Sequence, residues 1–354
     1  MTLLEQLNIR HPIFLAPMAG VSTPTLAAEV SNQGALGSLG LGASTVEQAR
    51  AQILETQQLT DRPFQVNFFC HQSVAEDPQA NQVWINALQP HFERLGASVP
   101  SSLKCIYPSF LDDDRYLELV LDTRPQAVSF HFGIPHPHQI QALKKAGILS
   151  MVTATNLAEA RLIEQAGIDV IIAQGIEAGG HRGLFNPTFD AAIHTADLVQ
   201  LICAHTTRPV VATGGVMNGH QARDLLKLGA QAVQMGTAFI PCKSSNANAA
   251  YRKALLEQPL TQVTASISGR PARGLIQHWH TEIDTPDRAA VAAYPYAYDL
   301  AKQLHQAAAK HGDQGYGAFW AGRHVAQIRP MDAADLINQL VLEINLSEIK
   351  HTSS

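Results

Sequence analysis

The chain has 354 residues, of which 46% are hydrophobic and 16% are charged, and its formal net charge is −5. This balance supports a large folded core and excludes a disordered chain. The 25 lysine and arginine residues form no dense run, so neither a nucleic-acid-binding surface nor an anionic-membrane-binding surface is expected.

Short runs of β-branched and aliphatic residues alternate with helical patterns through the first two thirds of the chain, which is typical of βα units on a parallel sheet. Eight such strands close naturally into a (β/α)₈ TIM barrel, which takes roughly 250 residues. Three segments, ALKKAGILSMV, LIEQAGIDVII and LLKLGAQAVQM, repeat a helix that ends at a glycine before a buried strand. An open doubly wound sheet would produce the same repeat. The strands are predicted at 12–16, 35–39, 64–69, 127–131, 149–153, 169–173, 209–213 and 231–235.

Two segments interrupt this alternation. Residues 71–125 separate the third and fourth strands by more than one helix requires, with a helix predicted to begin near 112–114. After about residue 240 the strand signal stops, and 247–255, 286–309 and 333–346 have helical patterns. We therefore predict a barrel over 1–240 with an insertion at about 71–125. Residues 241–354 are predicted to form a mostly helical appendage that covers the barrel mouth.

The cysteines and the N-terminus indicate the cellular compartment. Four cysteines lie far apart and form no C-x-x-C pair, which argues against a disulfide framework or a zinc-thiolate site. The start, MTLLEQLNIRHP, has charges where a signal peptide needs an apolar run, and no stretch of about 18 apolar residues occurs. We expect a cytoplasmic protein without a membrane span.

The glycine turns after the seventh and eighth predicted strands are the expected place for a phosphate. TGG at 213–215 and MGT at 235–237 expose backbone N–H groups, and barrels commonly bind phosphate between these two loops. The same glycines could simply form tight βα turns. APM at 16–18 follows the first strand and would let a flat ligand approach the backbone. FMN is a natural candidate for the ligand.

The segment QGIEAGGHRG follows the sixth predicted strand and contains His181. A histidine in a glycine-rich loop has little core to pack into. At the end of a barrel strand it can act as a base or as a hydrogen-bond donor to an anion, depending on its protonation state. The flanking Glu177 and Arg182 are expected to be solvated or paired structurally.

Other polar side chains are expected near the same end of the barrel. Asn67 ends the third strand and Gln174 follows the sixth, and their amides can bond the edge of a heterocycle. His131 ends the fourth strand. Together with His136 and His138 it lacks a helical face and a carboxylate, so no metal site is predicted.

Three polar residues near the end of the chain recur at helical spacing. Tyr294, Tyr298 and Lys302 stand at i, i+4 and i+8 and would share one face of a helix. This face could present a polar wall to a small anionic ligand, or it could belong to an ordinary amphipathic helix. Tyr107, which follows a short apolar run, leaves the same two alternatives open.

Several segments together resemble a known family. PIFLAPMAGVSTPTLAAEVSNQGALGSLG, QGIEAGGHRG, VVATGGV and AVQMGTAF are similar to the signature segments of the nitronate monooxygenases, formerly called 2-nitropropane dioxygenases. They occur in the family's order from residue 12 to about 239. YPYAYDLAK resembles the closing motif of the family's bacterial class I branch. The segment 319–323 departs from the family's Gly- and Gln-richer pattern, so the resemblance supports no flavin contact by this tail.

The resemblance implies a barrel that holds FMN noncovalently, with His181 as the catalytic residue. It implies a substrate pocket formed by His131, Tyr107, Tyr294, Tyr298 and Lys302. The implied FMN-binding residues are Ala16, Pro17, Met18, Asn67, Gln174, Gly179, Gly180, Gly214, Gly215, Gln234, Met235, Gly236 and Thr237.

The implied activity is the FMN-dependent oxidation of alkyl nitronates such as propionate 3-nitronate by O₂. One-electron transfer from the nitronate to FMN precedes the reaction with oxygen, and the products are a carbonyl compound and nitrite or nitrate. The expected role is detoxification, by a monomer or homodimer whose partners are the small-molecule nitronate and O₂. Two alternatives stay open: an NAD(P)H-dependent FMN reductase of quinones or enoyl thioesters, and a non-catalytic barrel that binds a phosphate ligand.

Overall fold

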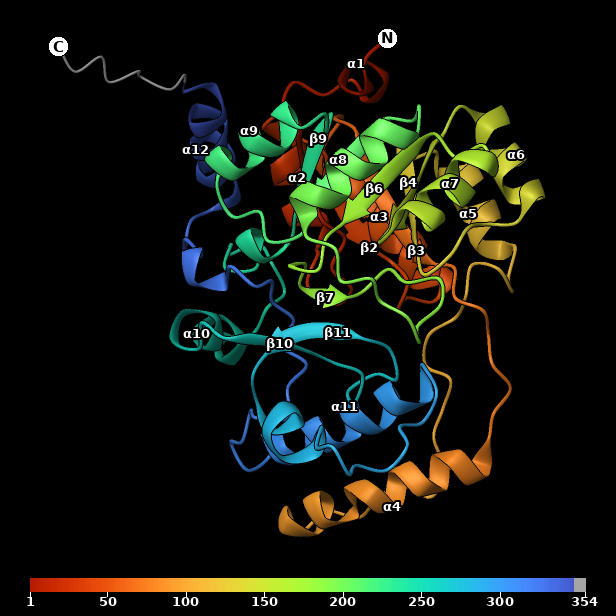
Figure 1. The fold of residues 1–354 in the computed structure, drawn as a ribbon, viewed down its shortest axis with the longest axis vertical. Coiled ribbons are helices and arrows are strands. Elements are labelled where there is room, and N and C mark those ends of the chain that lie inside the picture. The colour runs from red at the N-terminus through yellow and green to blue at the C-terminus, as the bar shows by residue number, and fades with distance from the viewer. Residues whose placement is uncertain (347–354) are drawn as a thin grey trace, which may run out of the picture.

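The computed structural model describes residues 1–346 and contains a barrel of eight parallel strands (Figure 1). The strands are ordered β1-β9-β8-β6-β5-β4-β3-β2, and an isolated parallel bridge from Phe14 to Leu36 joins the two ends. Every predicted strand is present within two residues at its start and one at its end, so the TIM barrel is confirmed. The strands are β1 Ile13–Leu15, β2 Gly37–Gly40, β3 Phe64–Phe69, β4 Ala127–His131, β5 Leu149–Ala154, β6 Val170–Gln174, β8 Val210–Thr213 and β9 Ala232–Met235.

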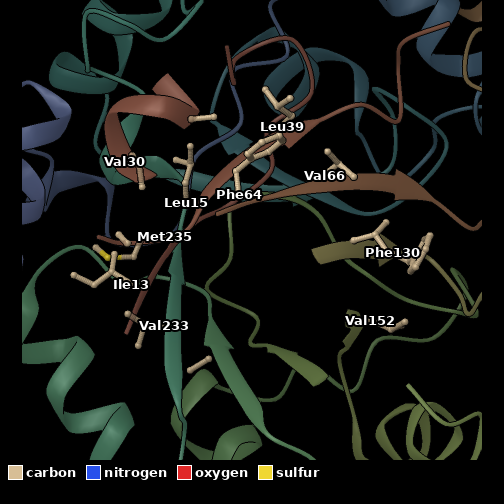
Figure 2. Packing of buried hydrophobic residues seen from close by; sticks show 14 of the residues in the cluster. Ile13, Leu15, Val30, Leu39, Phe64, Val66, Phe130, Val152, Val233 and Met235 are labelled. Atoms are coloured by element: carbon tan, nitrogen blue, oxygen red, sulfur yellow. The ribbon is translucent and has the colours of Figure 1, made fainter. Parts of the chain in front are cut away.

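Alternate residues of each strand face opposite sides, which builds two cores. Ile13 and Leu15 of β1 pack outward among helix residues such as Val30, as Figure 2 shows. Phe14, between them, belongs to a separate interior cluster with Leu3 and strand residues from across the barrel. The short helix α1 (Leu3–Leu7) thereby closes the end of the barrel opposite to α4 and α11 (Figure 1). Among the described residues, α1 and this interior cluster fill one end of the barrel, and the space for a ligand lies at the other end.

Helices cover the outside of the barrel. Seven of them lie between consecutive strands of the barrel. Three of these seven end at the glycines that the three similar sequence segments share, as predicted. Gly147, Gly167 and Gly229 have φ of 73°, 83° and 109°, the left-handed conformation that favours glycine. The seven are α2 Pro24–Asn32, α3 Val46–Leu59, α5 Arg115–Thr123, α6 Pro137–Ala146, α7 Leu157–Gln165, α8 Thr195–His205 and α9 Gly219–Lys227.

The eighth barrel helix comes from the far end of the chain. Helix α12 (Ala333–Asn345) packs against α9 and α2, whereas we had expected it beside the barrel mouth. The chain leaves the barrel after β9 through the short turn η1 (Thr237–Phe239), so the place between α9 and α2 is open. The apolar face of α12, which includes Leu336 and Leu340, fills it.

A second structural unit lies over the open end of the barrel. Helix α4 (Pro78–Arg94), from the segment between β3 and β4, packs against α11 (Tyr296–Ala309) through a cluster that contains Trp84 and Leu300. The remaining elements are helix α10 (Ala249–Glu257), strands β10 (Thr261–Thr264) and β11 (Ala272–Leu275), and a π-helix (Trp279–Ile283).

The strands β10 and β11 were not predicted, because their sequences, TQVT and ARGL, contain polar and glycine residues in place of the aliphatic runs that mark the barrel strands. They form an antiparallel sheet with β7 (Gly180–His181), which carries the candidate catalytic histidine. Helix α11 begins at Tyr296, ten residues later than predicted, directly after Pro295. Within residues 1–346, no helix is long and apolar enough to cross a membrane. The predicted appendage also includes residues 347–354, which lie outside the described residues.

Candidate active site

A cavity opens at the carboxyl ends of the barrel strands, beneath the unit formed by β10, β11 and α11. It encloses about 1330 Å³ of empty space including its open mouth. All the residues singled out from the sequence line it except Lys302. They are Ala16, Pro17, Met18, Asn67, Tyr107, His131, Gln174, Gly179, Gly180, His181, Gly214, Gly215, Gln234, Met235, Gly236, Thr237, Tyr294 and Tyr298.

Lys302 lies behind the wall of the cavity. Its Nζ is 4.8 Å from the ring centroid of Tyr107 and 5.4 Å from that of Tyr298. Burial lowers the pKa of its ammonium group. Lys302 therefore supports the two tyrosine rings through cation–π contacts and adds positive potential without lining the cavity itself.

Two glycine turns at the ends of β8 and β9 offer free backbone donors. Gly214 and Gly215 have φ of 125° and 70°. The N–H groups of Gly214, Gly215, Gly236 and Thr237 have no hydrogen-bond acceptor among residues 1–346. Adjacent parallel strands bring these N–H groups to one side of the cavity. Such a set of backbone donors fits a phosphate group.

Three side-chain amides on the cavity wall retain unused hydrogen-bonding atoms. Asn67 Nδ2 donates to Ser129 at 3.0 and 3.1 Å, which leaves Asn67 Oδ1 free. Gln174 Nε2 donates once, to the carbonyl oxygen of His181 at 3.0 Å, so its second hydrogen is free. Gln234 accepts from Gln65 at 3.4 Å and keeps its own amide hydrogens. Acceptors and donors of this kind match the edge of an isoalloxazine ring, which carries carbonyls, ring nitrogens and one N–H.

His181 is held in place by the strand pairing that the sequence analysis missed. Its partner in the sheet is Ala272 of β11, and Arg182 N–H donates to Pro271 O at 2.8 Å. The imidazole Nε2 lies 2.8 Å from Ser268 Oγ, while Nδ1 has no partner in the described chain. Nδ1 is not among the fully buried polar atoms, so it is the ring nitrogen that a ligand in the cavity can reach.

The surroundings of His181 disfavour its charged form. Burial, together with the nearby His131 and Arg270, lowers the pKa of the imidazole to about 3. Arg270 Cζ lies 4.5 Å from the Phe132 ring centroid, and the residue is 6% exposed. His181 is therefore neutral near pH 7.

His131 lines the cavity with both ring nitrogens already engaged. Nε2 lies 3.1 Å from the carbonyl oxygen of His181, which can only accept, so Nε2 carries the proton. Nδ1 lies 3.1 Å from Thr153 Oγ1 and accepts from that hydroxyl. His131 thus supports the backbone of His181 and has no free nitrogen for a substrate.

Phenol groups supply the remaining polar lining. The Tyr294 hydroxyl is buried and has no partner in the described chain. The Tyr298 hydroxyl accepts from Trp320 Nε1 at 3.2 Å, and burial raises its pKa to about 12. Burial also raises the pKa of Tyr294. Both phenols therefore stay protonated, and the Tyr298 hydroxyl can donate to an anion in the cavity.

Sequence reasoning missed Trp320, Ser268 and Arg270. The ring of Trp320 lies 5.2 Å from that of His181 and lines the cavity, although the resemblance gave the tail 319–323 no contact there. Gly322 N–H donates to Thr237 Oγ1 at 3.0 Å, which ties this tail to the eighth strand's turn. The aromatic pair Phe319-Trp320 was the only signal in the sequence, and Ser268 and Arg270 gave none.

The flanking charges are paired structurally. Arg182 is fully buried, and its Nε lies 2.7 Å from Asp190. Glu177 accepts from Thr195 N–H at 3.0 Å and from Thr195 Oγ1 at 2.8 Å. These pairs anchor the loop on either side of His181, as the sequence analysis allowed.

Three buried histidines make stability sensitive to acid. Burial lowers the pKa of His71 and of His131 to about 4, and that of His181 to about 3. In the unfolded chain these histidines bind protons near pH 6.5, whereas in the folded chain they bind them only at lower pH. Stability is therefore expected to fall as the pH drops from about 6.5 towards 4, by up to about 1.4 kcal/mol per pH unit for His71.

Urea unfolding between pH 7.5 and 4.5 measures this dependence, with His71→Phe as the comparison. Both nitrogens of His71 are buried without partners, and its ring packs against Tyr294 at 5.0 Å. Phenylalanine keeps the ring and removes the titration, so the variant should lose less stability on acidification. Equal pH slopes for the two proteins would contradict the assignment.

The chain is similar to known proteins along nearly its whole length. A sequence model of the family described as nitronate monooxygenase matches residues 1–343. A protein of Pseudomonas aeruginosa named nitronate monooxygenase is 49% identical over 341 residues, 96% of this chain and 97% of that one. A protein of the same name from Paraburkholderia phytofirmans is 48% identical over 348 residues, 98% and 95% of the two chains. The solved structure of a nitroalkane oxidase from Streptomyces ansochromogenes is similar with a TM-score of 0.86 at 36% identity, covering 97% of each chain.

Proposed function

The chain belongs to the nitronate monooxygenase family and is an oxidoreductase, and from this premise we propose that it oxidises small alkyl nitronates with bound FMN and O₂. The products would be a carbonyl compound and nitrite or nitrate. The observation that carries the proposal is the cavity itself. It combines a neutral histidine, protonated phenols and a set of free backbone N–H groups in one space.

FMN fits the groups that the cavity leaves unpaired. The N–H groups of Gly214, Gly215, Gly236 and Thr237 would hold its phosphate. Asn67, Gln174 and Gln234 would bond the ring edge, with residues 16–18 along its face. When bound, FMN supplies the electron acceptor and the reaction with O₂, while the protein supplies binding and orientation.

The remaining groups suit a small anionic substrate. Tyr298 would donate a hydrogen bond to the nitronate oxygens, or to a carboxylate as in propionate 3-nitronate, while the Tyr294 ring lines the cavity beside it. Arg270 and Lys302 lie close to these tyrosines, with Arg270 Cζ 5.7 Å from the Tyr294 ring centroid. No carboxylate forms an ion pair with either cation in residues 1–346. Their positive potential favours an anion in a partly desolvated site.

A cytoplasmic, detoxifying role completes the proposal. All four cysteines, Cys70, Cys105, Cys203 and Cys242, are free thiols, which supports a reducing compartment. Removal of reactive nitronates needs no partner other than O₂. We keep a monomer or homodimer as part of the proposal.

Anaerobic mixing of the purified protein with propionate 3-nitronate, while the flavin absorbance is recorded, tests the proposal. We expect a yellow protein whose absorbance falls with the nitronate and recovers when air is admitted. A yellow protein that nitronate leaves unchanged but NADH or NADPH bleaches would instead support a flavin reductase. A colourless protein that takes up no FMN would contradict the cofactor and leave a barrel that binds another phosphate ligand.

His131→Leu is expected to lower nitronate turnover about 10-fold. The substitution removes one of the two donors to the His181 carbonyl, at 3.1 Å, and leaves only Gln174 Nε2, and small misplacements of catalytic groups reduce rates. His131→Gln is the matched control, because its amide N–H can occupy the place of Nε2 and should restore most of the loss. The steady-state kcat of the two flavin-loaded variants measures this difference. Equal losses of kcat in both variants would contradict a positioning role for His131.

A further inference from the structure

The hydroxyl of Ser268 makes three hydrogen bonds whose directions are linked. We propose that Ser268 is a positioning residue that keeps the proton of His181 on Nε2 and leaves the Nδ1 lone pair facing the cavity. His181 then offers a proton acceptor to the cavity. The catalytic part of this inference rests on the proposed function, whereas the tautomer does not.

The hydrogen-bond directions follow from the partners. Ser268 Oγ lies 3.1 Å from the carbonyl oxygen of Arg270, which can only accept, so the hydroxyl proton points there. Arg270 N–H donates to Ser268 Oγ at 3.3 Å and occupies one of its lone pairs. The other lone pair faces His181 Nε2 at 2.8 Å and must receive an N–H. The opposite tautomer would leave the carbonyl of Arg270 without a donor in a residue that is 6% exposed.

The turn that carries Ser268 is held rigidly. Gly269 has φ of 87°, and a Cβ there would lie 2.6 Å from Tyr294 N and 2.7 Å from Ala292 O. The turn leads directly into β11, whose Ala272 pairs with His181 itself. The strand pairing therefore fixes both ends of the Ser268–His181 contact, and Ser268 is fully buried.

The charges around His181 favour the same state. The titratable and charged groups packed against it are His131 from β4, Tyr294 just before α11, Tyr298 in α11, and Arg270 before β11. None of them is a carboxylate, so nothing stabilises an imidazolium in the resting protein. A neutral ring with its proton on Nε2 offers a bare Nδ1 to the cavity.

This arrangement suits the step that a nitroalkane needs before it can be oxidised. The α C–H bond breaks, the proton passes to His181 Nδ1, and the electron pair moves into the nitro group. The product is the nitronate that the proposed reaction consumes, and the Tyr298 hydroxyl receives its oxygens. A preformed nitronate needs no such step, so the two substrates report different roles of the histidine.

NMR of the flavin-loaded protein labelled with ¹⁵N-histidine tests the tautomer. The His181 signals are assigned by their absence in His181→Asn, and long-range couplings to the ring protons tell which nitrogen carries hydrogen. We expect Nε2–H in the wild type, exchange between tautomers in Ser268→Ala, and Nε2–H again in Ser268→Thr. A wild-type signal for Nδ1–H, or an unchanged tautomer in Ser268→Ala, would overturn the proposal even if the threonine variant fails to fold.

Kinetics with nitroethane and with ethyl nitronate test the consequence. Ser268→Ala should lower kcat for nitroethane about 10- to 100-fold, less than the about 10⁴-fold seen when a carboxylate orienter is lost, and lower kcat for the nitronate much less. Ser266→Ala is the matched control, since Ser266 is equally buried in the same loop but bonds Asp284 at 2.9 Å. It should leave the ratio of the two rates unchanged.

The possible failures are distinguishable. A wild type that oxidises nitronate but not nitroethane, or equal losses for both substrates in Ser268→Ala, would overturn the acceptor role of Nδ1. A wild type that oxidises neither would reject the proposed function, while the NMR result would still decide the tautomer.

Discussion

Replacing His181 with asparagine is expected to lower nitroethane turnover by about 100- to 10,000-fold, the usual contribution of a general base. Ethyl nitronate turnover should fall by a smaller factor, about 10-fold. Its proton is already removed, but the imidazole ring that packs 5.2 Å from Trp320 is lost from the cavity wall. The neutral amide cannot take the α proton.

Flavin content separates loss of catalysis from loss of the cofactor. We expect His181→Asn to purify with its flavin, because the groups assigned to FMN lie on the turns after β8 and β9 and on other strands. His311→Asn, at an exposed position just past α11, controls for the substitution itself. Full activity of His181→Asn on both substrates would reject His181 as the catalytic residue.

Gly215→Ala is expected to weaken FMN binding about 10-fold or more. Gly215 has φ of 70°, and a Cβ there would lie 2.8 Å from Glu177 Cβ and 2.9 Å from His324 Nδ1. Glu177 cannot yield easily because Thr195 holds its carboxylate at 2.8 Å. The turn must therefore shift, and its N–H groups lose the alignment that a phosphate requires.

Gly147→Ala is the matched control for this experiment. Gly147 has φ of 73°, but a Cβ there would meet nothing within 4 Å. Both variants share the backbone strain of a left-handed alanine, roughly 1 kcal/mol, and only Gly215→Ala adds the steric contact at the cavity. Titration of the flavin-free proteins with FMN gives the two Kd values. Equal Kd values would contradict the assignment of the phosphate to the β8 turn.

The barrel and most of its cavity followed from local sequence. The eight strands were predictable because runs of β-branched and aliphatic residues are features of short segments. The same is true of glycines such as Gly147 that end the helices. Parallel strands bring their carboxyl ends to one edge. For that reason Asn67, His131 and His181, which are far apart in the chain, could be expected at one cavity.

The chemistry of that cavity depended on contacts between distant segments. The pairing of β7 with β11 joins residues about 90 positions apart, and neither GH nor ARGL contains the aliphatic run that marked the barrel strands. The sequence therefore predicted His181 but left open whether it accepts or donates, and nothing near His181 in the chain pointed to Ser268. His131 was predicted as a substrate contact, yet Thr153 and the His181 carbonyl occupy both its nitrogens.

Helix α12 also shows the difference between what a local sequence pattern predicts and what contacts between distant segments determine. Its amphipathic pattern specified a helix at 333–345, but not which surface its apolar face would cover. Only the departure of the chain after η1 leaves the place between α9 and α2 open. The sequence by itself determined the barrel, the glycine turns and the candidate catalytic histidine, because each is a local pattern. The tertiary structure decided the place of the eighth helix, the aromatic wall and the contact of His181 with Ser268, because each arises where segments distant in the chain meet.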